Sequence, residues 1–383
     1  MTRIAAAAAA LSLIALLPLR AQPAPPADAV EILDGVDPVL LLRGQEVPGK
    51  EALSAVHDGY RYLFASPETK AEFEKDPARY EPAFGGTCAR MGARTGGSTA
   101  LFAVHEGHIY LFGADDCLRR FQASPARFLP HPPAEAAATP QARARGRELL
   151  ELAARAAGGA SRLDALAGWR VETARTTSSP NGPATQTQIV TVALPDRVRE
   201  ERRAAFGTVI NVAGPAGAFG LFVAPDGQAG GDDRRAPAQR RALGEALQGD
   251  AARGLLALLR ARRDEGVTAA ALGATSVGGV AAEGVAVRTP RAAVRLDIDP
   301  ASGRVLRESY HERGPEGAYG EIALTLSDYR DAGGFTLPHA VAASFDGQPA
   351  PALGYTVTSW TLDPPLDPAA FLKPAPPAPA PRP

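Results

Sequence analysis

The sequence has few cysteines, no excess of charge of either sign, and no long apolar run after its first 22 residues. Its 383 residues include 2 cysteines, and 41 basic side chains stand against 42 acidic ones. The near-equal numbers of basic and acidic side chains argue against a nucleic-acid-binding surface, which normally needs a clustered basic excess. No later segment is long and apolar enough to span a bilayer as a helix, so we expect no transmembrane anchor in the mature chain.

Motifs of common catalytic and metal sites are also missing. The sequence has no Gly-x-Ser-x-Gly nucleophile motif, and the Gly-rich stretch 227–231 lacks the Lys-Ser/Thr pair of a phosphate-binding loop. The cysteine and histidine spacings of zinc sites are absent too. We therefore assign no catalytic residues and expect a binding protein, not an enzyme.

The first residues have the features of a secretory signal peptide. Arg3 precedes an apolar run over residues 4–19, and a small-residue cleavage site follows. The run is shorter than the ~20 residues of a spanning helix, and Pro18 interrupts its end; a retained anchor is the alternative. We expect residues 1–21 to be removed and the mature protein to be periplasmic or secreted.

Stretches rich in proline and alanine divide the rest of the chain into two modules. We expect linkers at 22–29 and 131–141 and a disordered tail at 374–383. The N-terminal module then covers residues 30–130 and the C-terminal module covers residues 142–373. We predict an α+β fold for both.

The N-terminal module contains an internal repeat. Residues 55–82 align with residues 103–130 without a gap, and twelve of the 28 aligned positions are identical. Each copy predicts a turn, a short aromatic strand and a helix that ends before a proline. Repeated supersecondary units usually pack against one another, so we expect the aromatic side chains of both copies to form the core of one small module.

The order of landmarks in this module resembles the YHS domain. The resemblance rests on an Asp-Pro-Val motif, a tyrosine-rich strand, a Ser-Pro helix start, a Phe…Asp-Pro…Tyr run, and a Pro-x-aromatic-Gly-Gly-x-Cys-Ala stretch, at residues 37–39, 60–64, 66–67, 73–80 and 82–89. The resemblance covers about 100 residues and implies a metal-linked role, as in some members. No cysteine accompanies residues 37–39, so the cysteine-pair metal site of other members does not carry over.

The C-terminal module begins with a helical pattern and continues mainly as strands. An amphipathic helix is predicted over residues 143–157 and a second long helix over 237–263. Alternating apolar residues predict strands between residues 171 and 212 and again between 292 and 360. Residues 197–203 mix both charges on one of these strands, a pattern typical of a solvent-exposed face.

Turn motifs between these strands resemble periplasmic outer-membrane lipoprotein carriers of the LolA/LolB type. They are an Asp-Pro-x-Ser-Gly turn at 299–303, a Gly-Gly-Phe-x-Leu-Pro run at 333–338, and a closing Leu…Leu-Asp…Phe…Pro segment at 362–374. The resemblance covers about 230 residues. It implies an antiparallel β half-barrel that packs on helices and can hold acyl chains, and hence a hydrophobic or lipid ligand and an envelope protein partner.

Cys88 and Cys117 are the first candidate site residues. In an oxidising compartment two cysteines are first a disulfide candidate, and a bridge between these positions would contribute ~3–4 kcal/mol in the loop-entropy approximation. Two unbonded thiols are the second interpretation. The third is a copper site, in which Met91, His105 and His108 complete a soft ligand set.

Two hypotheses of function follow from these patterns. In the first, the exported protein binds a hydrophobic ligand in the C-terminal half-barrel and the N-terminal module is an accessory. In the second, the N-terminal module binds or senses copper and the C-terminal module is a scaffold.

Overall fold

The computed structural model describes residues 29–131, 138–179, 182–231 and 236–373. The predicted signal peptide (1–21), the disordered tail (374–383) and most of both predicted linkers lie outside these residues. Within the described ranges, no helix has both the length and the apolar character needed to cross a membrane.

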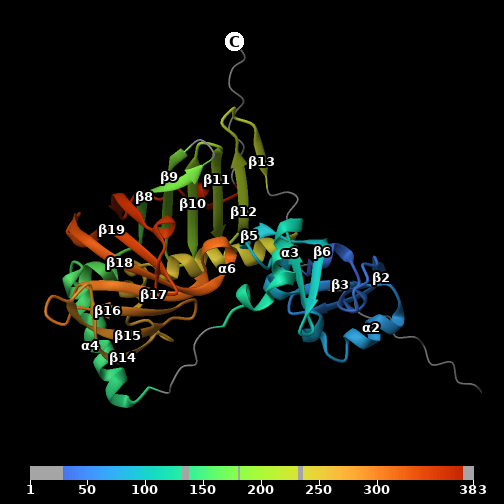
Figure 1. Cartoon of the computed structure of the whole chain (residues 1–383), viewed down its shortest axis with the longest axis horizontal. Helices are drawn as coiled ribbons and strands as arrows, with labels where there is room; N and C mark the ends of the chain where they lie inside the picture. Colours follow the sequence, from blue (N-terminus) through green and yellow to red (C-terminus); the bar gives the residue numbers. More distant parts are fainter. Residues whose placement is uncertain (1–28, 132–137, 180–181, 232–235, 374–383) are drawn as a thin grey trace, which may run out of the picture.

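The N-terminal module consists of two units with the same order of elements: two antiparallel strands, a helix and a 3-10 turn (Figure 1). In the first unit these are β2 (Lys50–His57), β3 (Tyr60–Phe64), α2 (Pro67–Phe73) and η2 (Pro77–Tyr80). In the second they are β6 (Ser98–His105), β7 (His108–Phe112), α3 (Asp115–Ala123) and η4 (Pro125–Arg127). The units follow the two copies of the sequence repeat.

Local sequence explains the turns and caps of the first unit. Asp58 and Gly59 both have positive φ angles, 47° and 76°, which an Asp-Gly hairpin turn adopts readily. The Ser66 side chain caps α2 by accepting a hydrogen bond from the Thr69 amide, with proline at the first helical position. Short strands complete two small sheets: β1 (Val30–Glu31) pairs with β3, and β4 (Thr87–Cys88) lies between β7 and β5 (Gly92–Gly96).

The Asp-Pro-Val motif has a structural role. Asp37 is fully buried and caps helix α1 (Pro38–Leu42) by accepting hydrogen bonds from the amides of Val39 and Leu40. Its other oxygen accepts from the Ala65 amide at 2.7 Å and from the Thr69 hydroxyl at 2.6 Å. One carboxylate therefore joins the start of α1 to the connection between β3 and α2.

The C-terminal module is built on an open 14-stranded sheet in which all neighbouring strands are antiparallel. One half contains β8 (Gly168–Ser179), β9 (Gly182–Ala193), β10 (Arg197–Ala204), β11 (Gly207–Gly214), β12 (Gly217–Val223) and β13 (Ala229–Gly231). The other contains β14 (Thr268–Val277), β15 (Val280–Arg288), β16 (Ala293–Ile298), β17 (Val305–Arg313), β18 (Tyr319–Ala332), β19 (Phe335–Phe345) and the short β20 (Gln348–Pro349). The last strand, β21 (Tyr355–Leu362), pairs with both β8 and β19 and so joins the halves.

The α-helices in the described part of this module are α4 (Pro140–Ala156), α5 (Ala160–Ala165), α6 (Pro237–Arg253) and α7 (Leu255–Ala261). Helix α6 lies between the strands of the first half and β17 (Figure 1). The expected antiparallel sheet packed on helices is thus confirmed. The helix predicted over 237–263 is two helices, because Gly254 adopts an extended conformation (φ −58°, ψ 143°) between them. The helix predicted from residue 143 starts at Pro140, where Thr139 caps it.

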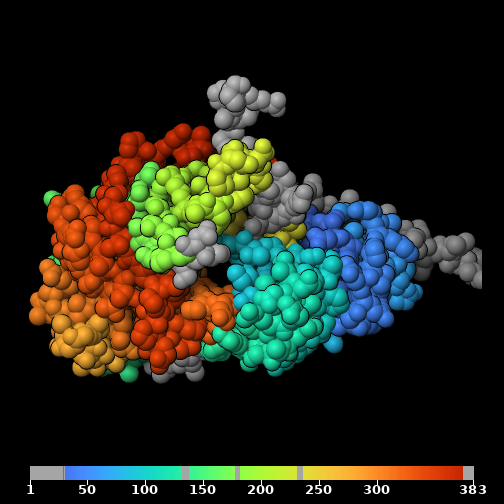
Figure 2. Space-filling view, turned by 45° about the horizontal axis from the view of Figure 1, so that its top comes forward, coloured from blue at the N-terminus to red at the C-terminus, as the bar shows by residue number. Residues whose placement is uncertain are grey.

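The two modules pack directly against each other (Figure 2). Gln239 of α6 is buried and its amide nitrogen donates to the carbonyls of Gly86 and Gly97, at 3.0 and 2.7 Å. On β17, the Arg313 guanidinium donates to the Ala89 carbonyl at 3.0 Å. Helix α6 and strand β17 therefore hold the N-terminal module in place through its backbone.

Candidate functional site

A cavity of about 820 Å³ lies between the inner face of the sheet, helices α6 and α7, and the edge of the N-terminal module. This volume falls within the roughly 300–1,000 Å³ of typical ligand sites. The N-terminal module closes one side of the cavity with residues of its η3 turn (Ala83–Gly86) and of β5. Residues from both modules therefore form one site.

One part of the cavity wall is apolar. The apolar lining residues come from β8 to β10, α6, α7, β18, β19 and β21: Trp169, Val171, Val190, Val192, Val198, Leu247, Leu255, Leu256, Ile322, Leu324, Leu326, Leu337, Val341, Val357 and Trp360. They face the same side because successive side chains of a strand alternate between the two faces of a sheet. On β8, for example, Val171 and Thr173 line the cavity, whereas Glu172 does not.

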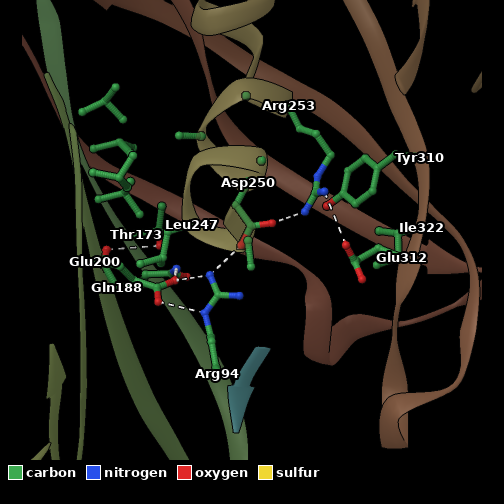
Figure 3. Close-up of a pocket in the computed structure, with 18 of the residues that line it drawn as sticks. Arg94, Thr173, Gln188, Glu200, Leu247, Asp250, Arg253, Tyr310, Glu312 and Ile322 are labelled. Carbon is green, nitrogen blue, oxygen red and sulfur yellow. Dashed lines mark hydrogen bonds and ion pairs between the residues drawn. The ribbon is translucent and has the colours of Figure 1, made fainter. Parts of the chain in front are cut away.

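A cluster of charged side chains lies where the N-terminal module meets this wall (Figure 3). Arg94 extends from β5 and donates to both carboxylate oxygens of Glu200, at 3.0 and 3.1 Å. The same guanidinium lies 2.5 Å from a carboxylate oxygen of Asp250 on α6. Arg94 therefore connects the N-terminal module to the sheet and to α6 through one ion-pair network.

Glu200 is the most heavily partnered acid in the cavity and is only 3% exposed. Besides Arg94, it accepts hydrogen bonds from Arg202, Gln188 and Asn211 at 2.8 to 3.1 Å. Burial alone would raise the pKa of its carboxyl, but Arg94 and Arg202 lower this pKa to about 2. The prediction of a solvent-exposed face for residues 197–203 is therefore wrong for the residues of β10 that point into the cavity.

Arg253 extends the network toward β17. It pairs with Asp250, lies 3.4 Å from a carboxylate oxygen of Glu312, and stacks over the Tyr310 ring at 4.7 Å (Figure 3). Every second residue of this part of β17 faces the cavity: Glu308, Tyr310 and Glu312.

Glu308 differs from the other acids of the cavity. It is 5% exposed, and no hydrogen bond or ion pair to its carboxyl occurs in the described ranges. Burial raises the pKa of this carboxyl to about 8, although Arg253 opposes the shift. Glu308 is therefore mostly protonated and neutral at pH 7.

The predicted cysteine pair is brought together by the fold. Cys88 and Cys117 are both buried, belong to the core of the second unit, and have their thiols within hydrogen-bonding reach of each other. Burial raises the pKa of the Cys117 thiol, although a 3.7 Å hydrogen bond from Arg90 opposes the shift. Both are free thiols in the structure, and a disulfide between them remains a prediction.

The other predicted metal ligands lie elsewhere. Met91 is 49% exposed and lines the cavity, while His105 and His108 face each other at the end of the β6–β7 hairpin. Cys88 pairs with Leu111, which lies roughly 10 Å along β7 from His108. Over the described ranges, no group of three or more His, Cys, Asp or Glu side chains is placed to hold a metal ion. The copper site remains a prediction.

The residues that shape the site were not assigned from the sequence. Arg94 and Glu308 belong to no motif, and Glu200 looked like one charge among many in a mixed run. For Glu308 a signal did exist. It sits at an inward position of an alternating strand, where an ionisable residue is unusual and often functional.

No family model matches the chain, and no curated protein matches it. Among solved structures, the chain is similar to a LolA superfamily protein from Nitrosomonas europaea, with 12% identity, a TM-score of 0.37, and coverage of 60% of this chain and 97% of that chain. It is also similar to a DUF1329 family protein from Desulfovibrio piger, with 10% identity, a TM-score of 0.36, and coverage of 59% and 97%. At this level of similarity, what the chain binds has to be inferred from its own residues.

Proposed function

We propose that this chain is an exported binding protein that holds a hydrophobic or lipid ligand in the cavity between its modules. The observation that supports the proposal is the 820 Å³ cavity itself, whose inner wall is lined by aliphatic side chains and two tryptophans. Removing apolar ligand surface from water stabilises the bound state by about 25 cal/mol per Å². The N-terminal module would act as an accessory that closes one side of the site, and the role is binding, not catalysis.

The chain offers a direct test, because its 2 tryptophans, Trp169 and Trp360, both line the cavity. An uncharged probe with bromine atoms on its chain, dibromostearyl alcohol, should quench their fluorescence when it binds. We expect saturable quenching at concentrations below those at which the probe forms micelles.

A variant that fills the cavity provides the control. Val171 and Val190 are register partners on β8 and β9 and both line the cavity. The double change Val171→Phe and Val190→Phe should abolish quenching. The matched change of Val56 and Val104 to Phe, at exposed equivalent positions of the repeat, should leave it intact. Equal quenching in the cavity-filled variant would refute the proposal, and so would absence of saturable quenching in the unmodified protein both by this probe and by the carboxylate with the same chain.

A further inference from the structure

Most charged groups of the cavity neutralise one another. Six arginines and five carboxyl groups line it. Glu200 pairs with Arg94 and Arg202, and Asp250 and Glu312 both pair with Arg253. Two groups at the apolar wall, Arg175 and Glu308, lack an ionic partner among the described residues.

Arg175 is a half-buried guanidinium with unused donors. One of its terminal nitrogens donates to the Gln188 side-chain oxygen at 2.8 Å, whereas its Nε is buried without a hydrogen-bond partner among the described residues. Gln188 uses its own amide nitrogen on Glu200 and so separates the two charges. A buried cation without a counter-ion is costly, and burial, followed by repulsion from Arg202, lowers the pKa of Arg175.

Glu308 does not supply the missing negative charge. Its raised pKa keeps it mostly protonated at neutral pH. Tyr355 interacts electrostatically with both Glu308 and Arg175. The Arg175 guanidinium lies 6.0 Å from the centre of the Tyr355 ring. This part of the cavity therefore presents one positive charge beside neutral polar groups.

The cavity-facing side of β8 changes from charged to apolar along its length. Its inward residues are Arg175, Thr173, Val171 and Trp169, in that order. At about 3.4 Å per residue, Arg175 and Trp169 are ~20 Å apart along the strand. On the adjacent strand β21, Val357 and Trp360 continue the apolar surface. Such a wall matches a ligand with one charged end and a long apolar chain.

We infer that Arg175 and Gln188 form a head-group site for a single-chain amphiphile whose head carries a carboxylate or a phosphate ester, with its chain lying along β8 toward Trp169. This inference rests on the proposed function, because it names the ligand class of the same cavity. An anionic head would use the free donors of Arg175 and supply the counter-ion that the protein lacks.

Comparison of two brominated probes with the same chain tests the head-group site. Dibromostearate carries a carboxylate at pH 7.5, and dibromostearyl alcohol carries a hydroxyl. We expect the unmodified protein to bind the acid about tenfold more tightly, or better, because only the acid brings a negative charge to the Arg175 guanidinium. Quenching of Trp169 and Trp360 measures both affinities without any substitution in the protein.

Three variants then locate the effect. Arg175→Met should bring the affinity for the acid down to that for the alcohol and leave the alcohol unchanged, and Arg175→Lys should retain part of the difference. Arg170→Met, on the other face of the same strand, should behave like the unmodified protein. Displacement of dibromostearate by hexadecanoate alone would identify a carboxylate head, and equal displacement by hexadecyl phosphate would indicate any anionic head.

The outcomes separate the two proposals. Equal binding of acid and alcohol by the unmodified protein would overturn the head-group site and leave a hydrophobic cavity. A preference for the acid that survives in Arg175→Met would also overturn it. Failure of both probes to bind would refute the proposed function itself.

Discussion

Thr69 and Cys117 occupy equivalent positions of the repeat, yet their surroundings differ. Thr69 donates to the buried carboxylate of Asp37, whereas Cys117 lies against Cys88. The same backbone arrangement therefore holds a hydrogen-bonded polar pair in the first unit and two thiols in the second. The thiols have no hydrogen-bonding role comparable to that of Asp37, so their state is set by the redox conditions around the protein.

If the chain is exported, the two cysteines should be oxidised. We expect the protein purified from an oxidising compartment to have no titratable thiols after unfolding in the absence of reductant. Changing Cys88 and Cys117 together to Ser should then lower the free energy of unfolding by ~2–4 kcal/mol. Detection of two thiols in the unfolded, unreduced protein would exclude the disulfide.

Glu308 should make the protein less stable as the pH rises. Its pKa is about 8 in the folded state and 4.5 ordinarily, so between these values the unfolded state has released the proton that the folded state keeps. Stability is then full below pH 4.5 and falls as the pH increases toward 8. The loss should reach ~1–3 kcal/mol, after allowance for water in the cavity.

Replacement of Glu308 by Gln tests this, because Gln has nearly the shape of a protonated Glu. Glu308→Gln should raise the free energy of unfolding at pH 8 and have little effect at pH 4.5, as measured by urea unfolding. The exposed Glu265→Gln is the control and should give no difference at either pH. A gain that is independent of pH would show that the pKa of Glu308 is not raised in the folded protein.

At the residue scale, sequence reasoning found groups that lie close together in the chain or stand out by rarity, such as the cysteine pair. It could not find the charge cluster. The burial of Glu200 depends on Arg94, which is 106 positions away and belongs to another module. No local pattern records such a pairing, because it exists only after the modules pack.

At the element scale, helix α6 is the central connection of the molecule. Leu243 and Leu247 on one side pack on the inner face of the sheet, and Gln239 on another side binds the N-terminal module. Its sequence contains the leucines of an amphipathic helix, but nothing in it shows that two different surfaces will be covered. The start of the helix at Pro237 was predictable for this reason, whereas its end at Arg253 and its two contacts were not.

Gln239→Ala should loosen the contact between the modules. It leaves the carbonyls of Gly86 and Gly97 without their donor, which costs roughly 1–3 kcal/mol if the groups stay buried. We expect faster amide hydrogen exchange in residues 83–97 and unchanged exchange in the distant strand β15. The exposed Gln228→Ala is the control, and unchanged exchange in residues 83–97 of the Gln239 variant would contradict this role.

The strands were predicted unevenly. Those that contain several β-branched residues, such as β11 and β16, were expected from their sequence. Strands β14 and β15 were not expected, because their sequence is dominated by alanine and glycine, which have weak strand preference. Their pairing with each other and the packing of α4 on β14 stabilise them in the fold. Tertiary contacts here outweigh local propensity.

At the scale of the whole molecule, the cavity exists because two modules share one boundary. Arg94 is the side chain of the N-terminal module that reaches both the sheet and α6. A ligand that fills the cavity therefore touches a surface whose position depends on this ion-pair network. Changes at Arg94 should affect both the stability of the protein and the closure of the site.

Arg94→Met removes one partner of a buried acid and should lower the free energy of unfolding by ~2–4 kcal/mol at pH 7. The loss is moderated because Glu200 keeps its bond to Arg202 and Asp250 keeps its bond to Arg253. The highly exposed Arg119→Met is the control and should change stability little.

The effect should depend on pH in a defined direction. The pKa of Glu200 is lowered from 4.5 to about 2 in the folded protein, so its contribution is complete above pH 4.5 and disappears as the pH falls toward 2. Because Arg94 is the first of the charges that lower this pKa, the stability difference between the unmodified protein and Arg94→Met should shrink over the same interval. Urea unfolding at pH 7, 4.5 and 3 measures it. A difference that stays constant down to pH 3 would mean that Arg94 contributes by packing alone, and the charge network would then not be what holds the modules together.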